Sequence, residues 1–477
     1  MPADSSAVCP IHRHARARPE ALALWTPDRR WTYAELDAAV TATAGRLQEV
    51  GSESTAIVAL RVRRDADLVL LLWAVWRTGR VAMPLSTRWP SAQVRKAVQQ
   101  TGAQLLVTRE SSLLEGEGEG ETCSPDQILR RDGNGGTPDP GPQSIQRRAT
   151  LVFTSGSTGA PKGVLHSWAN HLYSAKGSNA NLPLRRGDRW LLSLPLYHVG
   201  GLAILVRCAL AGAAVAVPGR DASLSASLDA TGATHLSLVA TQLRRLLEGR
   251  DALPARVYGV LLGGGPLPDT LLRRGHARNW PLLTSYGSTE MASQIATTSP
   301  GASLDDLRTA GRRLPHRRLR ISKEGEILVA GRTLCARVLG EGGLRDPRTN
   351  AWYRTGDLGR LDAQGRLHVE GRTDRQFVSG GENIQPEEIE AALEEIEGID
   401  RAVVVPVPDA EYGRRPVAFV RSRPEGTPDG WRDVLSAVLP RFKHPDAVYE
   451  LPEAAVEAPM KVDRERLRQW ARERRER

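Results

Sequence analysis

The stretch that decides the fold is TLVFTSGSTGAPKG, residues 150–163. An apolar run of the β type, Leu151 to Phe153, opens into glycine, serine and threonine and closes with Pro-Lys-Gly. Glycines let the backbone turn its N–H groups toward one point and the hydroxyls add donors, so such a loop suits a phosphate. It is not a P-loop, because Pro161 precedes the lysine and Gly163 follows it. A flexible linker is the alternative, but the buried-type strand that leads in argues against it.

Composition favours a multidomain globular enzyme. A chain of 477 residues is too long for one compact core, and its 40% hydrophobic and 25% charged content is ordinary. No apolar run reaches the roughly 18 residues that span a bilayer. The N-terminus lacks the layout of a secretion signal, so we expect a cytoplasmic protein. The four cysteines are scattered without a C-x-x-C pair, which predicts neither disulfides nor a zinc site.

The net charge of +10 does not indicate a nucleic-acid partner. Only six of the 65 basic residues are lysine, and the excess of arginine is spread along the chain. The densest basic run, 464–477, is interleaved with acidic residues and is typical of a solvated helix face. Basic and aromatic residues do not alternate as they do in nucleic-acid binders. We therefore expect small-molecule partners; a homo-oligomer is compatible with the sequence.

Residues 20–110 alternate between predicted helices and strands. A helix begins near Tyr33, where Thr32 and Glu35 form a capping box. Strands are expected at 55–60, 81–85 and 104–108, with an apolar helix at 67–78. This alternation predicts a parallel, doubly wound sheet. Residues 111–148, rich in Gly, Glu, Pro and Ser, are interpreted as a mobile surface connection.

Three further strands end in residues suited to a ligand. The predicted strand 190–196 runs into Tyr197-His198-Val199-Gly200-Gly201, the strand 257–262 into three glycines at 263–265, and the strand 282–284 into SYGSTE at 285–290. In a parallel sheet such exits meet at the carboxyl edge, where ligands bind. We expect these three exits to share one sheet.

Arg207 lies inside the apolar run 202–217. An unpaired buried guanidinium would cost several kcal/mol, so Arg207 must either reach the surface or face an anion. Both alternatives remain open from the residues alone.

From residue 317 onward the pattern changes to short alternating strands, and the Gly371-Arg372 junction precedes a last unit of about a hundred residues. That unit is expected to contain helix 386–396, strands 401–407 and 415–420, helix 431–439 and strand 447–450. It is a plausible small α+β domain. We predict an N-terminal domain of residues 1–371 and a C-terminal domain of residues 372–477.

These motifs together resemble those of the adenylate-forming superfamily of acyl-CoA synthetases, peptide-synthetase adenylation domains and luciferases. The resemblance rests on the phosphate loop, YGSTE at 286–290, YRTGD at 353–357, GRTD at 371–374, SGGENI at 379–384 and a C-terminal lysine, in the family's order. It implies an α/β fold: a large N-terminal domain of doubly wound sheets with a distorted β-barrel subdomain, followed by a small mobile α+β domain. It also implies that a carboxylate attacks ATP to give acyl-AMP and pyrophosphate, and that coenzyme A then displaces AMP.

The resemblance implies roles for individual residues. The β- and γ-phosphates would be held by the loop residues Thr154, Ser155, Gly156, Ser157, Thr158, Gly159 and Lys162. The adenine and the acyl pocket would be lined by Gly263, Gly264, Gly265, Ser285, Tyr286 and Gly287, with Thr289 at the α-phosphate and Glu290 on Mg²⁺. The ribose would bind Asp357 with help from Arg372; Asp374 would be the hinge, and Gly380 and Gly381 would leave room for the pantetheine arm of coenzyme A.

Lys461 is the expected catalytic cation, because the reaction builds charge on the α-phosphoryl oxygens. The sequence departs from the family around it: Met460 stands where glycine is usual, after the unusual stretch 453–459, and Arg375 stands where a second aspartate is common. These departures bear on the efficiency of adenylation and not on the fold.

Within the superfamily, the segments 194–201 and 289–295, with Arg207 nine residues beyond His198, look most like the o-succinylbenzoate–CoA ligases of menaquinone biosynthesis. Such a substrate has two carboxylates, and the resemblance implies that Arg207, beside Ser293, would bind the one that does not react. His198 would lie at the pocket mouth. Together with Lys461 and Thr289, His198 is expected to be catalytic. The alternatives are a ligase for a fatty or aryl monocarboxylate, and a weakened adenylate-binding regulatory protein. An amino-acid adenylation domain is less well supported, since no carboxylate lies near His198 to take an ammonium group.

Overall fold

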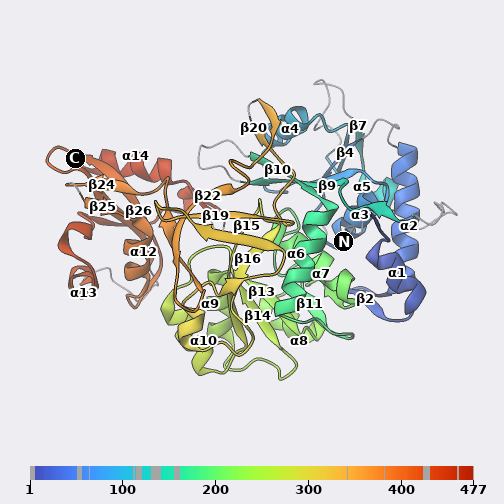
Figure 1. Ribbon diagram of the computed structural model, residues 1–477, viewed down its shortest axis with the longest axis horizontal. Coiled ribbons are helices and arrows are strands. Elements are labelled where there is room, and N and C mark those ends of the chain that lie inside the picture. The colour runs from blue at the N-terminus through green and yellow to red at the C-terminus, as the bar shows by residue number, and fades with distance from the viewer. Residues whose placement is uncertain are drawn as a thin grey trace.

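A computed structural model describes residues 6–50, 56–63, 65–110, 113, 121–129, 141–154, 162–340, 342–380, 382–422, 430–458 and 461–475. Figure 1 shows a large N-terminal body and a smaller C-terminal unit beside it. No helix in this described portion is both long and apolar enough to cross a bilayer.

Two sheets form the N-terminal body, each with a parallel core; the first has antiparallel strands at one edge and the second at both. In the described residues the first sheet has the order β21 (Gly343–Arg345), β20 (Arg337–Gly340), β10 (Lys162–Ser167), β9 (Arg148–Thr154), β5 (Val81–Pro84), β4 (Ile57–Arg61), β6 (Leu105–Thr108) and β7 (Glu121–Cys123). The second has the order β17 (Arg312–Arg313), β16 (Ser293–Thr297), β15 (Leu282–Ser288), β14 (Gly259–Leu262), β13 (His235–Leu238), β11 (Arg189–Leu191), β12 (Ala214–Ala216), β2 (Leu22–Trp25) and β3 (Arg30–Thr32).

Helices fill the space between the two sheets and cover their outer faces. Strand residues alternate accordingly: Val58 and Leu60 pack into the central core while Ala59 packs into an outer one. The central core contains α1 (Pro10–Ala17), α2 (Tyr33–Val50), α3 (Asp65–Arg77), α6 (Trp168–Asn181) and α7 (Val199–Ala211). The outer cores contain α4 (Ser91–Thr101) on the first sheet and α8 (Leu224–Thr231), α9 (Ala240–Gly249), α10 (Asp269–Ala277) and α11 (Leu304–Leu307) on the second.

A third, curled sheet and the C-terminal unit complete the expected fold class, which is confirmed. The curled sheet has the order β18 (Arg317–Ile321), β19 (Glu326–Gly331), β22 (Tyr353–Leu361) and β23 (Leu367–Arg372). The C-terminal unit has β26 (Ile399–Asp409), β27 (Gly413–Ser422) and β28 (Val448–Glu450), the pairs β24 (Phe377–Ser379) with β25 (Glu382–Ile384) and β29 (Val456–Ala458) with β30 (Lys461–Val462), and helices α12 (Pro386–Glu394), α13 (Trp431–Val438) and α14 (Arg464–Arg475). The division at residues 371 and 372 stays a prediction.

Several local predictions are confirmed and others are wrong. Thr32 and Glu35 form the capping box at the start of α2. The interval 111–148 is not only a connection, because β7 pairs with β6, α5 (Pro125–Ile128) has its own capping box, and β8 (Gln143–Ser144) pairs with β1 (Ser6–Ala7). The strand expected at 190–196 ends at Leu191, since Ser193 to Pro195 leave the sheet before α7.

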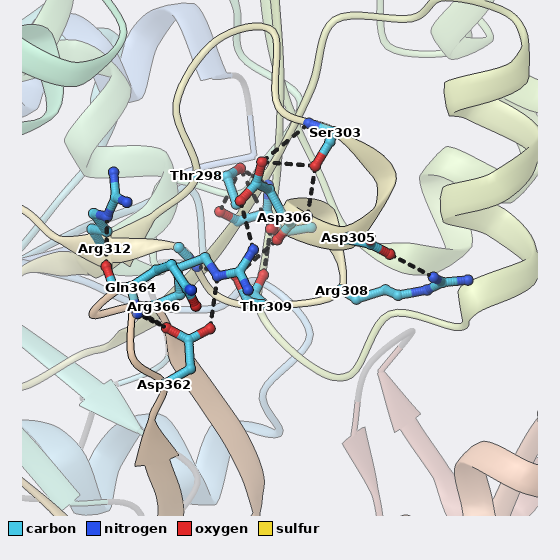
Figure 2. A network of polar contacts seen from close by, with 12 residues as sticks. Thr298, Ser303, Asp305, Asp306, Arg308, Thr309, Arg312, Asp362, Gln364 and Arg366 are labelled. Atoms are coloured by element: carbon cyan, nitrogen blue, oxygen red, sulfur yellow. Dashed lines mark hydrogen bonds and ion pairs between the residues drawn. The ribbon is translucent and has the colours of Figure 1, made fainter.

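A polar network fastens the hairpin β22–β23 to the second sheet (Figure 2). Arg366, in the hairpin turn, lies 2.9 Å from Asp306 on α11 and 2.7 Å from Asp362. Arg312 on β17 donates to the Gln364 carbonyl at 3.0 Å. The network therefore fixes the closed end of this hairpin, whose open end carries Asp357 and Arg372.

Candidate active site

A cavity of about 4320 Å³ lies between the two units and collects most of the candidate residues. Its N-terminal wall includes Thr154, Lys162, the glycines 263–265 and the segment 284–290. Its C-terminal wall includes Asp374 and residues from α12 and the start of α14. The site is therefore built where the two units meet.

Asp357 and Arg372 form a pair at the open end of the hairpin β22–β23. They are register partners, and Arg372 Nη1 donates to Asp357 Oδ1 at 2.9 Å. The Tyr286 hydroxyl donates to the other carboxylate oxygen at 2.5 Å. Burial raises the pKa of Asp357, and the hydrogen bond from Tyr286 and the charge of Arg372 oppose that rise. The carboxylate is thus oriented at the cavity wall as an acceptor for hydroxyl groups.

Thr289 and Glu290 lie in the turn of the hairpin β15–β16. Here a prediction needs correction: Ser285 to Ser288 are not a loop after the strand but continue β15, pairing antiparallel with β16. Glu290 Oε1 accepts from the Tyr353 hydroxyl at 2.9 Å, and Glu290 lines the cavity. One oriented carboxylate at the cavity wall suits Mg²⁺, which is commonly bound through one or two carboxylates and substrate phosphates. In the part of the chain that the structure describes, no cluster of three or more metal-ligating side chains occurs.

The phosphate loop connects β9 to β10, which are antiparallel. The strands before the three glycine-bearing exits, β11, β14 and β15, share the second sheet as expected, whereas the strands that flank the phosphate loop, β9 and β10, belong to the first. The two sheets bring their edges to the same cavity, so the convergence is preserved by packing between sheets. Thr154 and Lys162 line the cavity, and Ser155, Gly156, Ser157, Thr158 and Gly159 lie outside the described residues.

Arg207 lies in the middle of α7 with an exposed fraction of 1%, which excludes the surface alternative. Its Nη2 donates to the Ser293 hydroxyl at 3.2 Å, and its guanidinium lies 5.3 Å from the centre of the Trp190 ring. Its Nε has no hydrogen-bond partner among the described residues, and the side chain lines the cavity. Burial lowers the pKa of Arg207 to about 10, so the group is still a cation at neutral pH.

The glycines and His198 form other parts of the wall. A Cβ on Gly263 would lie 2.8 Å from the Ser285 hydroxyl oxygen, and Gly264 has a φ of +88°. Both positions therefore favour glycine, and a flat group can approach the backbone there. His198 stands at the N-cap of α7, packed against the Tyr197 ring and exposed to the cavity. Desolvation, followed by the charge of Arg88, lowers its pKa below 6.5.

The C-terminal candidates are only partly brought to this cavity. Asp374 lines it and binds Arg372 Nε at 2.8 Å. Gly380 has a φ of +57° and packs against Tyr412, away from the cavity. Gly381 lies outside the described residues. The backbone of Lys461 begins β30, and the next two residues, Val462 and Asp463, line the cavity.

Tyr353 is a residue of the site that sequence reasoning gave no role of its own, whereas Trp190, whose ring faces Arg207, is part of the central core. Tyr353 opens the YRTGD motif, and its position there was the available signal for a role beside Glu290.

Family models and known proteins match this chain over most of its length. The model of the AMP-binding enzyme family matches residues 11–337, and that of the AMP-binding enzyme C-terminal domain matches residues 388–458. A 2-succinylbenzoate–CoA ligase of Bacillus cereus is 33% identical over 97% of this chain and 98% of its own. The o-succinylbenzoate CoA synthetase (MenE) of Bacillus subtilis, in complex with the acyl-adenylate intermediate OSB-AMP, matches with a TM-score of 0.90 at 30% identity, covering 97% of this chain and 98% of that one.

A double mutant of the same Bacillus subtilis protein, bound with its product analogue OSB-NCoA, matches with a TM-score of 0.74 at 30% identity over 97% of this chain and 99% of that one. Coverage and identity are nearly the same for these two structures, whereas the TM-score differs. The chain belongs to the AMP-binding enzyme family.

Proposed function

We propose that this member of the AMP-binding enzyme family, an adenylate-forming acid–CoA ligase, converts 2-succinylbenzoate to 2-succinylbenzoyl-CoA in menaquinone biosynthesis. In the first half-reaction a succinyl carboxylate oxygen forms a bond to the α-phosphorus of ATP and pyrophosphate leaves. In the second the coenzyme A thiol loses its proton, its sulfur attacks the acyl carbon, and AMP leaves. The benzoate carboxylate takes no part in either bond change.

One observation carries the choice of substrate: Arg207 is a fully buried cation on the cavity wall whose Nε has no partner among the described residues. A buried cation without a counter-charge is costly, so the site favours an anion beside it. The benzoate carboxylate is such an anion, and a guanidinium binds carboxylates in a fixed geometry. A monocarboxylic acid, whose one carboxylate must reach the α-phosphate, would leave Arg207 unpaired.

The remaining N-terminal residues take roles in nucleotide and acid binding. Asp357, held by Tyr286 and Arg372, accepts from the ribose hydroxyls. Thr289 meets the α-phosphate, and Glu290, oriented by Tyr353, would hold Mg²⁺. When bound, Mg²⁺ would neutralise phosphate charge during the displacement. The β- and γ-phosphates are assigned to the loop residues Thr154, Ser155, Gly156, Ser157, Thr158, Gly159 and Lys162, and the adenine and acyl surfaces to Gly263, Gly264, Gly265, Ser285, Gly287, His198 and Ser293.

The C-terminal unit supplies the mobile parts. Lys461 is the first residue of β30, and we assign to it the stabilisation of the charge that develops on the α-phosphoryl oxygens. Asp374 is the hinge about which the unit moves between half-reactions. Gly380 and Gly381 border the path of the pantetheine arm once that movement brings them to the cavity.

The test is pyrophosphate release with ATP and Mg²⁺, comparing 2-succinylbenzoate with benzoate and with a medium-chain fatty acid, each with and without coenzyme A. We expect turnover with 2-succinylbenzoate, and Arg207→Ala should raise its KM more than it lowers kcat. Preference for a monocarboxylate would identify a general acyl-CoA ligase. ATP binding without pyrophosphate release for any acid would identify a regulatory adenylate-binding protein.

A further inference from the structure

The turn that ends the hairpin β15–β16 has an unusual backbone. Ala292 has a φ of +54° and Ser293 a φ of +102°, although neither is glycine. Residues with side chains adopt such conformations rarely, and they persist where the surrounding structure holds them. The same turn directs the Ser293 hydroxyl to Arg207. Something in the structure must therefore hold this turn.

Arg317, the first residue of β18, holds the turn from both sides. Its Nε donates to the Gln294 carbonyl at 2.8 Å, on the C-terminal side of Ser293. Its Nη2 donates to the Ser174 hydroxyl at 3.2 Å, and that hydroxyl donates to the Ala292 carbonyl at 2.6 Å. One guanidinium thus reaches the carbonyls on either side of Ser293, one directly and one through Ser174.

The rest of the guanidinium is also bonded to carbonyl groups. Nη1 donates to Pro315 at 2.8 Å and to Tyr173 at 3.4 Å, and Nη2 donates to Ser174 at 3.2 Å. No carboxylate is among the recorded partners of Arg317 within the described residues, and its exposed fraction is 1%. Burial, aided by the charge of Arg207, lowers the pKa of Arg317 to about 9, which still leaves a cation at neutral pH. Two buried cations, Arg207 and Arg317, therefore influence each other within the N-terminal body.

Helix α6 leaves space for this side chain. A Cβ on Gly177 would lie 2.0 Å from Arg317 Nη1 and 2.7 Å from the Pro315 carbonyl oxygen. No other residue type fits there without moving the guanidinium. Gly177, Ser174 and Arg317 thus form one unit, which we name the turn clamp.

We propose that Arg317 is a positioning residue for substrate specificity: through the turn clamp it fixes Ser293 so that Ser293 and Arg207 present a ready-made pocket for the second carboxylate of the acid. Arg317 is not among the residues that line the cavity, so it acts through Ser293 and does not touch the substrate. This inference rests on the proposed function for the identity of the acid. It adds a residue far outside the binding motifs, from the strand that opens the curled sheet.

The experiment measures kcat/KM for 2-succinylbenzoate and for 3-benzoylpropionate, which keeps the reacting carboxylate and lacks the benzoate one. We expect Arg317→Lys to lower the ratio of kcat/KM for 2-succinylbenzoate to kcat/KM for 3-benzoylpropionate by about tenfold. Lysine keeps the positive charge but loses the forked hydrogen bonds of the guanidinium, a loss equivalent to about one charged hydrogen bond. Ser174→Ala, a milder change, should lower the ratio by about fivefold. Gly177→Ala should act in the same direction by displacing Arg317.

Matched controls separate positioning from loss of stability. Arg278→Lys changes another guanidinium that donates to backbone carbonyls, those of Leu247 and Arg250, away from the turn. Gly249→Ala adds a Cβ in a helix where nothing lies within 4 Å. Both should leave the ratio unchanged, even if the melting temperature falls.

Each outcome has a defined meaning. Equal losses on both acids in the clamp variants would overturn the proposal and leave Arg317 a structural residue. If Arg317→Lys does not fold, Ser174→Ala and Gly177→Ala carry the test. If the wild-type enzyme does not prefer 2-succinylbenzoate, the proposed function fails; a crystal structure of Ser174→Ala then decides the clamp, which is overturned if Ser293 keeps its φ and its contact with Arg207.

Discussion

Asp357 and Arg372 face each other across the hairpin β22–β23, with Arg372 Nη1 2.9 Å from Asp357 Oδ1. Arg372 also binds Asp374, so one guanidinium joins the proposed ribose-binding carboxylate to the proposed hinge. The end of the N-terminal body and the start of the C-terminal unit are thus linked through the nucleotide site. Substitutions of Asp357 or Arg372 should therefore weaken ATP binding more than they weaken binding of the acid.

Asp357→Asn should raise the KM for ATP by about tenfold, because the carboxylate that accepts from the ribose hydroxyls loses its charge and one acceptor. The KM for the acid should change little. Pyrophosphate release at varied ATP and at varied acid gives both constants. Asp251→Asn, a change at a 98% exposed carboxylate, is the control. An unchanged KM for ATP in Asp357→Asn would contradict the assignment of this carboxylate to the ribose.

Arg366→Ala should loosen the hairpin that carries Asp357 and Arg372. It removes contacts of 2.9 Å to Asp306 and 2.7 Å to Asp362 in the network of Figure 2. We expect a melting temperature lower by a few degrees, for a loss of about 1 kcal/mol, and a KM for ATP raised about threefold. The control is Arg360→Ala on the same hairpin, where the pair with Glu370 is more than half exposed and worth little. Equal effects of the two changes would show that the network does not hold the hairpin.

The sequence was sufficient for the fold class and for most residues of the N-terminal wall of the site, because strand ends rich in glycine and hydroxyl residues are recognisable from the sequence alone. It was not sufficient for their arrangement. The phosphate loop and Ser285 lie on different sheets, a relation set by the packing of central helices that no local pattern encodes. Ser285 to Ser288 were expected to leave the sheet, but tertiary pairing with β16 keeps them in it.

For Arg207, the sequence predicted an unusual position but not whether the side chain reaches the surface. Its position in an apolar run left two alternatives, and only the exposed fraction of 1% decides between them. The sequence around Arg317 gave no indication that this side chain is buried. Arg317 opens a strand that also contains Arg318 and Arg320, and its burial follows from long-range contacts with α6 and with the hairpin β15–β16.

Glu394, the last residue of α12, should make stability depend on pH. Desolvation raises its pKa to about 7, and Glu390 adds to the rise while the backbone of Ala402 and the charges of Arg244 and Arg401 oppose it. The unfolded chain releases this proton near pH 4.5, whereas the folded chain releases it near pH 7. The free energy of unfolding therefore falls as pH rises between these values, and above pH 7 the full cost of burying the charged carboxylate applies.

Glu394→Gln should therefore stabilise the protein at pH 8, by on the order of 2 kcal/mol, and have little effect below pH 5. Calorimetry at pH 5 and pH 8 measures the two differences in melting temperature. Glu397→Gln, at an exposed position three residues on, should show no difference between the two pH values. A gain for Glu394→Gln that is the same at both would mean that the carboxyl is charged throughout this range.

Arg244 on α9 and Asp400 in the C-terminal unit should favour adenylation over thioester formation. Arg244 Nη1 lies 2.9 Å from Asp400 Oδ1, and Nη2 donates to the Asp400 carbonyl at 3.0 Å. This contact between the units belongs to the arrangement that matches the acyl-adenylate complex of the Bacillus subtilis relative at a TM-score of 0.90, against 0.74 for its product-analogue complex. With Arg244 at 12% exposure, such a pair contributes about 1 kcal/mol to holding the arrangement.

Arg244→Ala and Asp400→Ala should each slow single-turnover pyrophosphate release about threefold to fivefold, while acyl-CoA formation from supplied acyl-adenylate keeps its rate or gains. The double variant should be no slower than the worse single one, because both changes remove the same contact. Arg250→Ala, which breaks the pair with Asp229 within the N-terminal body, is the matched control. Additive losses in the double variant would mean that the two residues act independently of their shared contact. Equal slowing of both half-reactions would mean that the pair contributes to general stability and not to the choice between arrangements.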